Sequence, residues 1–234
     1  MGFEVPVYPQ CLSSVTIKGS NLAPYSQVLK AIHGQVAEYG TCTLRSVHLQ
    51  GARTSSDVLL WGMKPFIQDP VIGANIQYCY LELHRRQSFT QASLFSLSEC
   101  FALKSFSVKL WLHTSPTMMT PTDINYVLSL FESLLPSSKM LHTVSLILIK
   151  VRNFDIDSHR LRSEPIDWKR LEESLVKLNQ IREFVFDYRL NGGGMAVDEC
   201  CSVEENLSQL KARGILKIAF VRLYTVKDDI SIER

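Results

Sequence analysis

The sequence predicts an α/β fold: a solenoid in which a parallel sheet lines a concave face and helices cover only the convex side. Three observations predict this fold. One short apolar pattern recurs along the chain, helix-like segments lie between its copies, and alternate positions within the copies differ in polarity. With 234 residues, of which 46% are hydrophobic, the chain is long enough to bury a large core.

The pattern is an aliphatic residue, two variable residues, an apolar residue, a variable residue and an apolar residue. Its starts lie between 27 residues (Ile76 to Leu103) and 40 residues (Leu141 to Ile181) apart, a spacing typical of stacked repeats. Each copy is rich in Val, Ile, Phe or Leu and is predicted to be a strand. The seven copies are LSSVTI at Leu12, LRSVHL at Leu44, IQYCYL at Ile76, LKSFSV at Leu103, LHTVSL at Leu141, IREFVF at Ile181 and ILKIAF at Ile215.

Helix patterns occupy the intervals between the copies. In the fourth interval Thr120 is placed to cap a helix, Pro121 suits its first position and Pro136 ends it. Weaker patterns predict helices over residues 58–67 and 94–103. The apolar stripes that define the two clearest N-terminal helices are Val28, Leu29, Ile32 and Val36, and Ile124, Val127, Leu128, Phe131, Leu134 and Leu135.

Two further helices are predicted toward the C-terminus. Asp167 is a plausible cap for a helix that presents Trp168, Leu171, Leu175 and Leu178 on one face. A second helix carries Leu207 and Leu210 and ends at Gly214. A strand that is reached again through a helix is parallel to its predecessor, so the whole chain is predicted to form one parallel sheet.

Helices on both faces of that sheet would make a doubly wound fold, and helices on one face a solenoid. The fourth and sixth pattern positions are apolar in all seven copies, whereas ten of the fourteen residues at the fifth and seventh positions are polar, charged or Tyr. Because side chains alternate between faces, one face is predicted to be dry and the other exposed to water. The predicted outward side chains are chiefly Lys18, His48, Gln50, Tyr80, Glu82, Lys109 and Asp187.

These hexapeptides resemble the strand core L-x-x-L-x-L of the leucine-rich-repeat family over nearly the whole chain. More narrowly, PIDWKRLEESL (165–175) and LKARGILKIAF (210–220) are similar to the irregular repeat tails of fungal F-box proteins. The repeats are longer than the usual 20–29 residues, and the Asn or Cys that usually follows the strand is not regularly present. On this basis residues 1–234 are expected to form a single irregular leucine-rich-repeat-like domain of about seven strand units.

The resemblance implies a non-catalytic protein-binding module, of the kind that forms the substrate-recognition arm of an F-box ubiquitin ligase component. Its partner would be an unidentified protein bound on the concave face. An F-box needs about forty residues before the repeats by the family's pattern, and here the first copy begins at Leu12. The resemblance therefore assigns adaptor binding to no residue, and the chain is expected to be a fragment or a repeat-only relative.

Composition argues against several other classes of partner. The net charge is only +2, with no clustered basic face, so nucleic acid is not expected as a partner. No run approaches the roughly 18 apolar residues needed to cross a membrane. The six cysteines form no C-x-x-C pair, and no secretory signal begins the chain, so reduced thiols in the cytoplasm or nucleus are predicted.

Motifs that carry catalytic chemistry are missing from the sequence. Gly192, Gly193 and Gly194 lack the Lys and Ser or Thr of a phosphate loop, no two histidines stand four residues apart, and no G-x-S-x-G segment occurs. No cofactor, no metal and no enzymatic activity are therefore predicted. Two alternatives stay open: an α/β enzyme with a site in the loops after Asn153 and Asn191, and a structural remnant without a partner.

Overall fold

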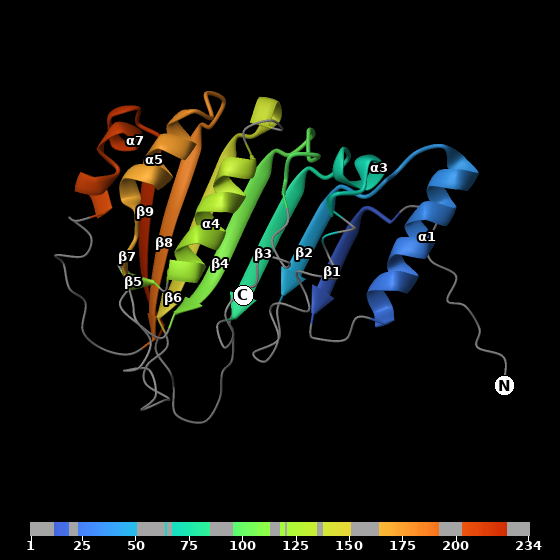
Figure 1. The fold of residues 1–234 in the computed structure, drawn as a ribbon, viewed down its shortest axis with the longest axis horizontal. Coiled ribbons are helices and arrows are strands. Elements are labelled where there is room, and N and C mark those ends of the chain that lie inside the picture. The colour runs from blue at the N-terminus through green and yellow to red at the C-terminus, as the bar shows by residue number, and fades with distance from the viewer. Residues whose placement is uncertain are drawn as a thin grey trace.

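The computed structural model describes residues 12–18, 23–50, 64, 67–84, 96–112, 118–119, 121–134, 138–150, 164–191 and 203–223. Strands and helices alternate along most of the chain (Figure 1). In chain order the elements are β1 Ser14–Lys18, α1 Ala23–Tyr39, β2 Ser46–Gln50, α3 Pro70–Gly73, β3 Tyr78–His84, β4 Ser105–Leu112, β5 Met118–Met119, α4 Pro121–Ser133, η2 Ser138–Met140, β6 Thr143–Lys150, β7 Glu164–Pro165, α5 Trp168–Val176, β8 Glu183–Asn191, α7 Ser208–Ala212 and β9 Leu216–Leu223.

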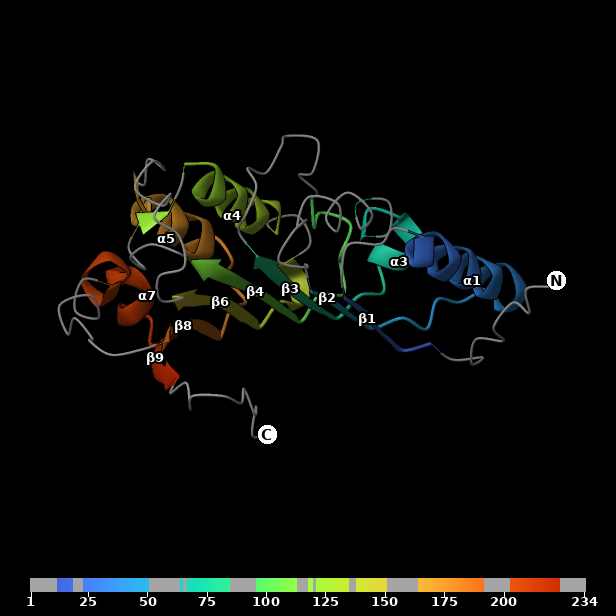
Figure 2. The ribbon, with the colours of Figure 1, turned by 90° about the horizontal axis from the view of Figure 1, so that it is seen from below.

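The main sheet is parallel throughout, and its strands follow one another in the order of the sequence. The described residues form seven strands in the order β1-β2-β3-β4-β6-β8-β9. The labelled helices α1, α3, α4, α5 and α7 all lie on one side of this sheet (Figure 2). The two residues of β5 and the two of β7 form a separate antiparallel pair. The predicted α/β class with one parallel sheet is confirmed.

The strand register reproduces the repeat alignment read from the sequence in six of the seven copies. The fourth-position residues of these copies stand side by side across the sheet: Val15, Val47, Cys79, Phe106, Val144 and Phe184. The seventh copy was misaligned, because Leu216 and not Ile218 pairs with Phe184. The error is two residues, and side chains alternate with a period of two, so the faces assigned to this strand are unchanged.

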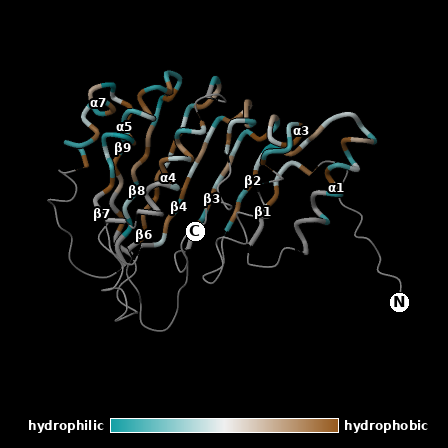
Figure 3. The backbone as a smooth tube through the Cα atoms, viewed as in Figure 1, coloured by the Kyte–Doolittle hydropathy of each residue, from teal (hydrophilic) through white to brown (hydrophobic). Residues whose placement is uncertain are grey.

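The helix side of the sheet forms the core. Leu49, Leu81, Val108, Leu146 and Phe186 stand in one row across five neighbouring strands and are each at most 1% exposed. Hydrophobic residues alternate with polar ones along these strands (Figure 3). The helices complete the core with large side chains, among them Tyr126, Leu130 and Phe131 of α4 and Trp168, Leu171 and Leu175 of α5.

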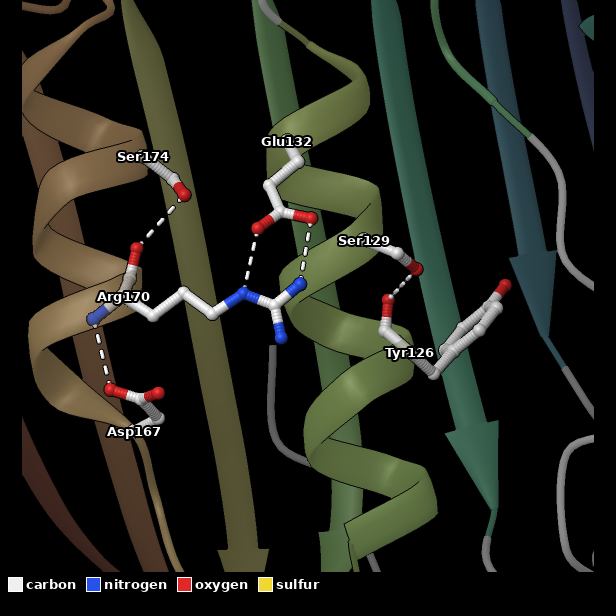
Figure 4. Close-up of polar contacts among 6 residues, drawn as sticks. All are labelled: Tyr126, Ser129, Glu132, Asp167, Arg170 and Ser174. Atoms are coloured by element: carbon white, nitrogen blue, oxygen red, sulfur yellow. Dashed lines mark hydrogen bonds and ion pairs between the residues drawn. The ribbon is translucent and has the colours of Figure 1, made fainter.

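The helix boundaries follow the capping residues expected from the sequence. Helix α4 begins at Pro121, as predicted. The Asp167 side chain accepts a hydrogen bond of 3.0 Å from the Arg170 backbone N–H at the start of α5 (Figure 4). Gly214 follows α7 with φ of 70°, a conformation that only glycine adopts without strain. The predicted boundary residues Thr120 and Pro136 lie outside the described residues.

Two intervals differ from the sequence prediction. Residues 96–103 form turns and no helix, so the helix predicted over 94–103 is wrong for this part. The interval that ends there is the shortest between copies, which leaves little room for a helix. The short helix α3 was missed; Asp69 caps it by accepting from the backbone N–H groups of Val71 and Ile72. Most of the helix predicted over 58–67 lies outside the described residues.

Polar side chains join consecutive helix-side segments to one another. Arg170 of α5 donates to both carboxylate oxygens of Glu132 in α4, at 2.7 and 2.9 Å (Figure 4). The buried carboxylate of Glu172 accepts from the backbone N–H groups of Gln209 and Leu210 in α7, at 2.7 and 3.3 Å. These contacts join α4 to α5 and α5 to α7, on the side of the sheet away from its polar face.

Replacement of Leu146 by Ala is expected to lower the free energy of unfolding by about 2–5 kcal/mol, because the side chain is 1% exposed in the middle of the core row. Ser145→Ala is the matched control, since Ser145 precedes it on the opposite face and should change stability by less than about 0.5 kcal/mol. Urea denaturation followed by circular dichroism measures both. Equal effects of the two substitutions would contradict the assignment of faces.

Candidate functional site

The face of the sheet opposite the helices, called here the open face, is defined by three rows of residues that the strand register sets side by side. Where the burial of these residues is described, most are half-buried or exposed, in contrast to the core rows. The first row is Thr16, His48, Tyr80, Ser107, Ser145, Val185 and Lys217; the second is Lys18, Gln50, Glu82, Lys109, Ile147, Asp187 and Ala219; the third is His84, Trp111, Ile149, Arg189 and Val221.

Glu82 of β3 is the centre of a polar cluster with two residues of β4. Its Oε1 accepts a hydrogen bond of 2.8 Å from Trp111 Nε1 and lies 3.1 Å from Lys109 Nζ. The same ammonium group lies 4.9 Å from the centre of the Trp111 ring, within the range of a cation–π interaction. Glu82 is 4% exposed, so its charge is balanced by contacts and not by bulk water.

Asp187 and Arg189 form a second charged pair within β8. Nε and Nη2 of Arg189 both donate to Oδ2 of Asp187, at 2.9 and 2.7 Å. The hydrogen bonds to Asp187 raise the pKa of Arg189, which secures the positive charge. Asp187 is 7% exposed, and its other oxygen, Oδ1, is buried without a hydrogen-bond partner among the described residues.

His48 and Tyr80 form an aromatic pair on β2 and β3. Their ring centres lie 4.2 Å apart in an edge-to-face arrangement. The pKa of the Tyr80 hydroxyl is raised well above its ordinary value, chiefly by burial and then by the negative charge of Glu82. Arg189 lowers that pKa and Asp187 raises it, so groups on β3 and β8 interact electrostatically across the two strands between them.

The structure places the seven predicted contact residues in the first two rows of the open face. It brings Glu82 into contact with Lys109 and His48 into contact with Tyr80, while Gln50 stands beside Glu82 in the register. Lys18 is the last residue of β1, and the structure describes its backbone but not its side chain.

The prediction that Glu82 and Asp187 face solvent is wrong, because both are buried. Each carries a long cationic partner: Lys109 beside Glu82, and Arg189 beside Asp187. These partners are the more exposed member of each pair. Sequence alternation predicts the face on which a side chain lies. It does not predict the exposed fraction of that side chain, because long neighbouring side chains can cover it.

Trp111 and Arg189, which contact Glu82 and Asp187, are absent from the residues predicted for this face. Both stand in the third row, three residues beyond the end of the six-residue pattern. The signal was present, because the alternation continues through KLWL in β4 and FDYR in β8. Extending the period of two past the hexapeptide would have included them.

Several segments named from the sequence fall on residues that the structure does not describe. The glycines at 192–194 and the loops after Asn153 and Asn191 lie outside the described residues. Within the described part of the chain, no group of three or more His, Cys, Asp or Glu residues is placed to hold a metal ion. Among those same residues, no helix combines the length and the apolar character that crossing a membrane requires.

Three described cysteines belong to the core and not to a reactive site. Cys42, Cys79 and Cys100 are free thiols and all are buried. Burial raises the pKa of Cys100 to about 12 and that of Cys79 well above its ordinary value. Because the thiolate is the nucleophile, these thiols are unreactive at neutral pH.

Replacement of Glu82 by Ala is expected to lower the free energy of unfolding by about 1–3 kcal/mol, since it leaves Trp111 Nε1 and Lys109 without this acceptor. Glu183→Ala is the control: Glu183 pairs with Lys217, whose side chain is 67% exposed, and its loss should cost less than about 1 kcal/mol. Urea denaturation followed by Trp fluorescence compares the two variants. A smaller effect at Glu82 than at Glu183 would refute the proposed importance of its buried contacts.

The raised pKa of Tyr80 predicts an alkaline effect on stability. A folded-state pKa above the unfolded value of about 10 stabilises the protein below that pH, and the stabilisation is lost as the pH rises through the folded pKa. In a titration of absorbance at 295 nm, Tyr80→Phe should therefore leave the tyrosine step near pH 10 unchanged. A smaller step in the variant than in the wild type would show that Tyr80 titrates near pH 10.

Comparisons of the chain with protein-family models, with curated proteins and with solved structures found no match. The function therefore has to be argued from the arrangement of the open face.

Proposed function

We propose that this chain is a leucine-rich-repeat-like solenoid and acts as a non-catalytic protein-binding module whose open face binds the partner. The partner is an unidentified protein, and neither nucleic acid nor a membrane is proposed. Following the resemblance of residues 165–175 and 210–220, we propose the substrate-recognition arm of an F-box-type ubiquitin ligase component as its cellular role. The free thiols of Cys42, Cys79 and Cys100 support a reducing compartment, the cytoplasm or nucleus.

The strand order supports the solenoid. A doubly wound α/β domain reverses its strand order at a switch point, where it binds ligands. The described strands follow the sequence without a reversal, and the labelled helices lie on one side of the sheet (Figure 2). Stacked repeats of this kind leave one broad sheet face for a partner.

The composition of the open face is the observation that carries the proposal. Tyr80, Trp111 and Arg189 are of the three residue types that most often dominate binding energy at protein interfaces. All three are half-buried, so each retains surface that a partner can cover. The contacts of Trp111 with Glu82 and of Arg189 with Asp187 hold these side chains in place before binding, which reduces the entropy lost on association.

A comparison of two double variants tests this proposal. Tyr80→Ala with Lys109→Ala removes two side chains of the open face, while Lys169→Ala with Glu173→Ala removes two exposed side chains of α5 on the helix side. Affinity purification with quantitative mass spectrometry should recover a specific partner at least tenfold less with the first variant than with the wild type or the second. Circular dichroism checks that both variants fold.

Equal recovery of all specific partners by the two double variants would contradict binding through the open face. Loss of partners only in the α5 variant would move the binding surface to the helix side.

A further inference from the structure

We infer that the open face selects an acidic protein segment, whose carboxylates bind between Lys109 and Arg189. This inference rests on the proposed function and adds the chemistry of the partner.

The first observation is the difference in side-chain exposure between the acid and the cation of each charged pair. The Glu82 side chain is 5% exposed and its partner Lys109 is 17% exposed; the Asp187 side chain is 10% exposed and its partner Arg189 is 36% exposed. In both pairs the cation is more exposed than the acid.

The second step is the number of hydrogen-bond donors. A lysine ammonium group has three donors, and a guanidinium group has five in a planar fork. Among the described residues, Lys109 contacts Glu82, while Arg189 uses Nε and Nη2 on a single oxygen of Asp187. Each cation therefore retains donors after its internal pairing. A guanidinium fork of this kind fits a carboxylate.

The third step is the spacing of the two cations. Lys109 lies on β4 and Arg189 on β8, and β6 runs between these strands. Adjacent strands are about 4.8 Å apart, so the two backbones are separated by about 10 Å. Between them the open face presents the half-buried Ile147 of β6, while Ile149 of the same strand is only 2% exposed. The exposed Val221 of β9 lies on the other side of Arg189. Two cations with apolar side chains beside them fit a segment that combines carboxylates with aliphatic or aromatic side chains.

A nucleic acid fits these observations less well than an acidic peptide. Phosphate backbones are bound by many cations at once, and affinity grows with the number of phosphates neutralised. Lys217 is another cation of the open face, and its ammonium group already pairs with Glu183 at 2.6 Å. The net charge of the whole chain is only +2.

Selection of random twelve-residue peptides by phage display on the full chain tests the inference. Enriched peptides should carry more Asp and Glu than Lys and Arg, together with apolar residues. A synthetic copy of the most enriched peptide should bind in fluorescence anisotropy, and binding should weaken as salt is raised. Lys109→Gln and Arg189→Gln should each weaken binding at least fivefold, and Arg189→Lys should restore part of it. Both Gln variants keep a donor for the buried acid beside them.

Lys177→Gln is the matched control, because this exposed lysine follows α5 on the helix side and should leave binding unchanged. Enrichment of neutral or basic peptides, the absence of any enriched peptide, or tighter binding of a single-stranded RNA oligomer than of the peptide would overturn the acidic partner. If neutral or basic peptides are enriched and lose binding in Tyr80→Ala, the acidic inference fails and the proposed function stands. If binding is insensitive to every open-face variant, both fail.

Discussion

Side-chain alternation in strands held in one unbroken register is the constraint on which this structure depends. In the main sheet each strand pairs with its neighbour in the order β1-β2-β3-β4-β6-β8-β9, without a shift that would exchange its faces. Val15, Val47 and Cys79 therefore fall in one buried row, and Thr16, His48 and Tyr80 in the row on the other side. A slip of one residue would bury the polar rows and expose the core, at a cost that grows with every strand. Burial of the apolar residues on the helix side fixes the register, and the register in turn determines which residues form the open face.

On both sides of the sheet, carboxylates pair with donors from the same strand or from a neighbouring element. On the helix side, Arg170 and Glu132 pair between successive helices, and Glu172 binds backbone N–H groups of the next one. On the open face, Glu82 binds Trp111 and Lys109 of the adjacent strand, and Oδ2 of Asp187 binds Arg189 of its own strand, while Oδ1 has no partner among the described residues. A buried carboxylate is tolerated when donors surround it and is costly otherwise. The internal pairing fixes the orientation of the basic and aromatic side chains that remain accessible.

The sequence predicted the architecture better than the details of the site. The apolar pattern placed six strands in their correct register, and Asp167 and Gly214 marked helix ends as expected. The seventh strand was placed two residues off because the pattern begins with an aliphatic residue, which Ile215 supplies, whereas the observed register puts Arg213 at that position. The site was harder to predict, because the burial of Glu82 depends on how Lys109 and Trp111 lie over it. Their side-chain positions follow from packing and not from spacing.

The sequential strand order also determines how this molecule can change over evolutionary time. In the main sheet, strand pairing joins only strands that are neighbours in that order, and the helix links described above join consecutive helices. In such a stack, gain or loss of one internal unit by duplication or deletion leaves the pairing rules of every other unit intact. The irregular lengths between Leu44 and Ile215 are compatible with this, since added residues enter the connections and not the ladder. The width of the open face can thus change by whole units while the pairing of the other strands stays the same.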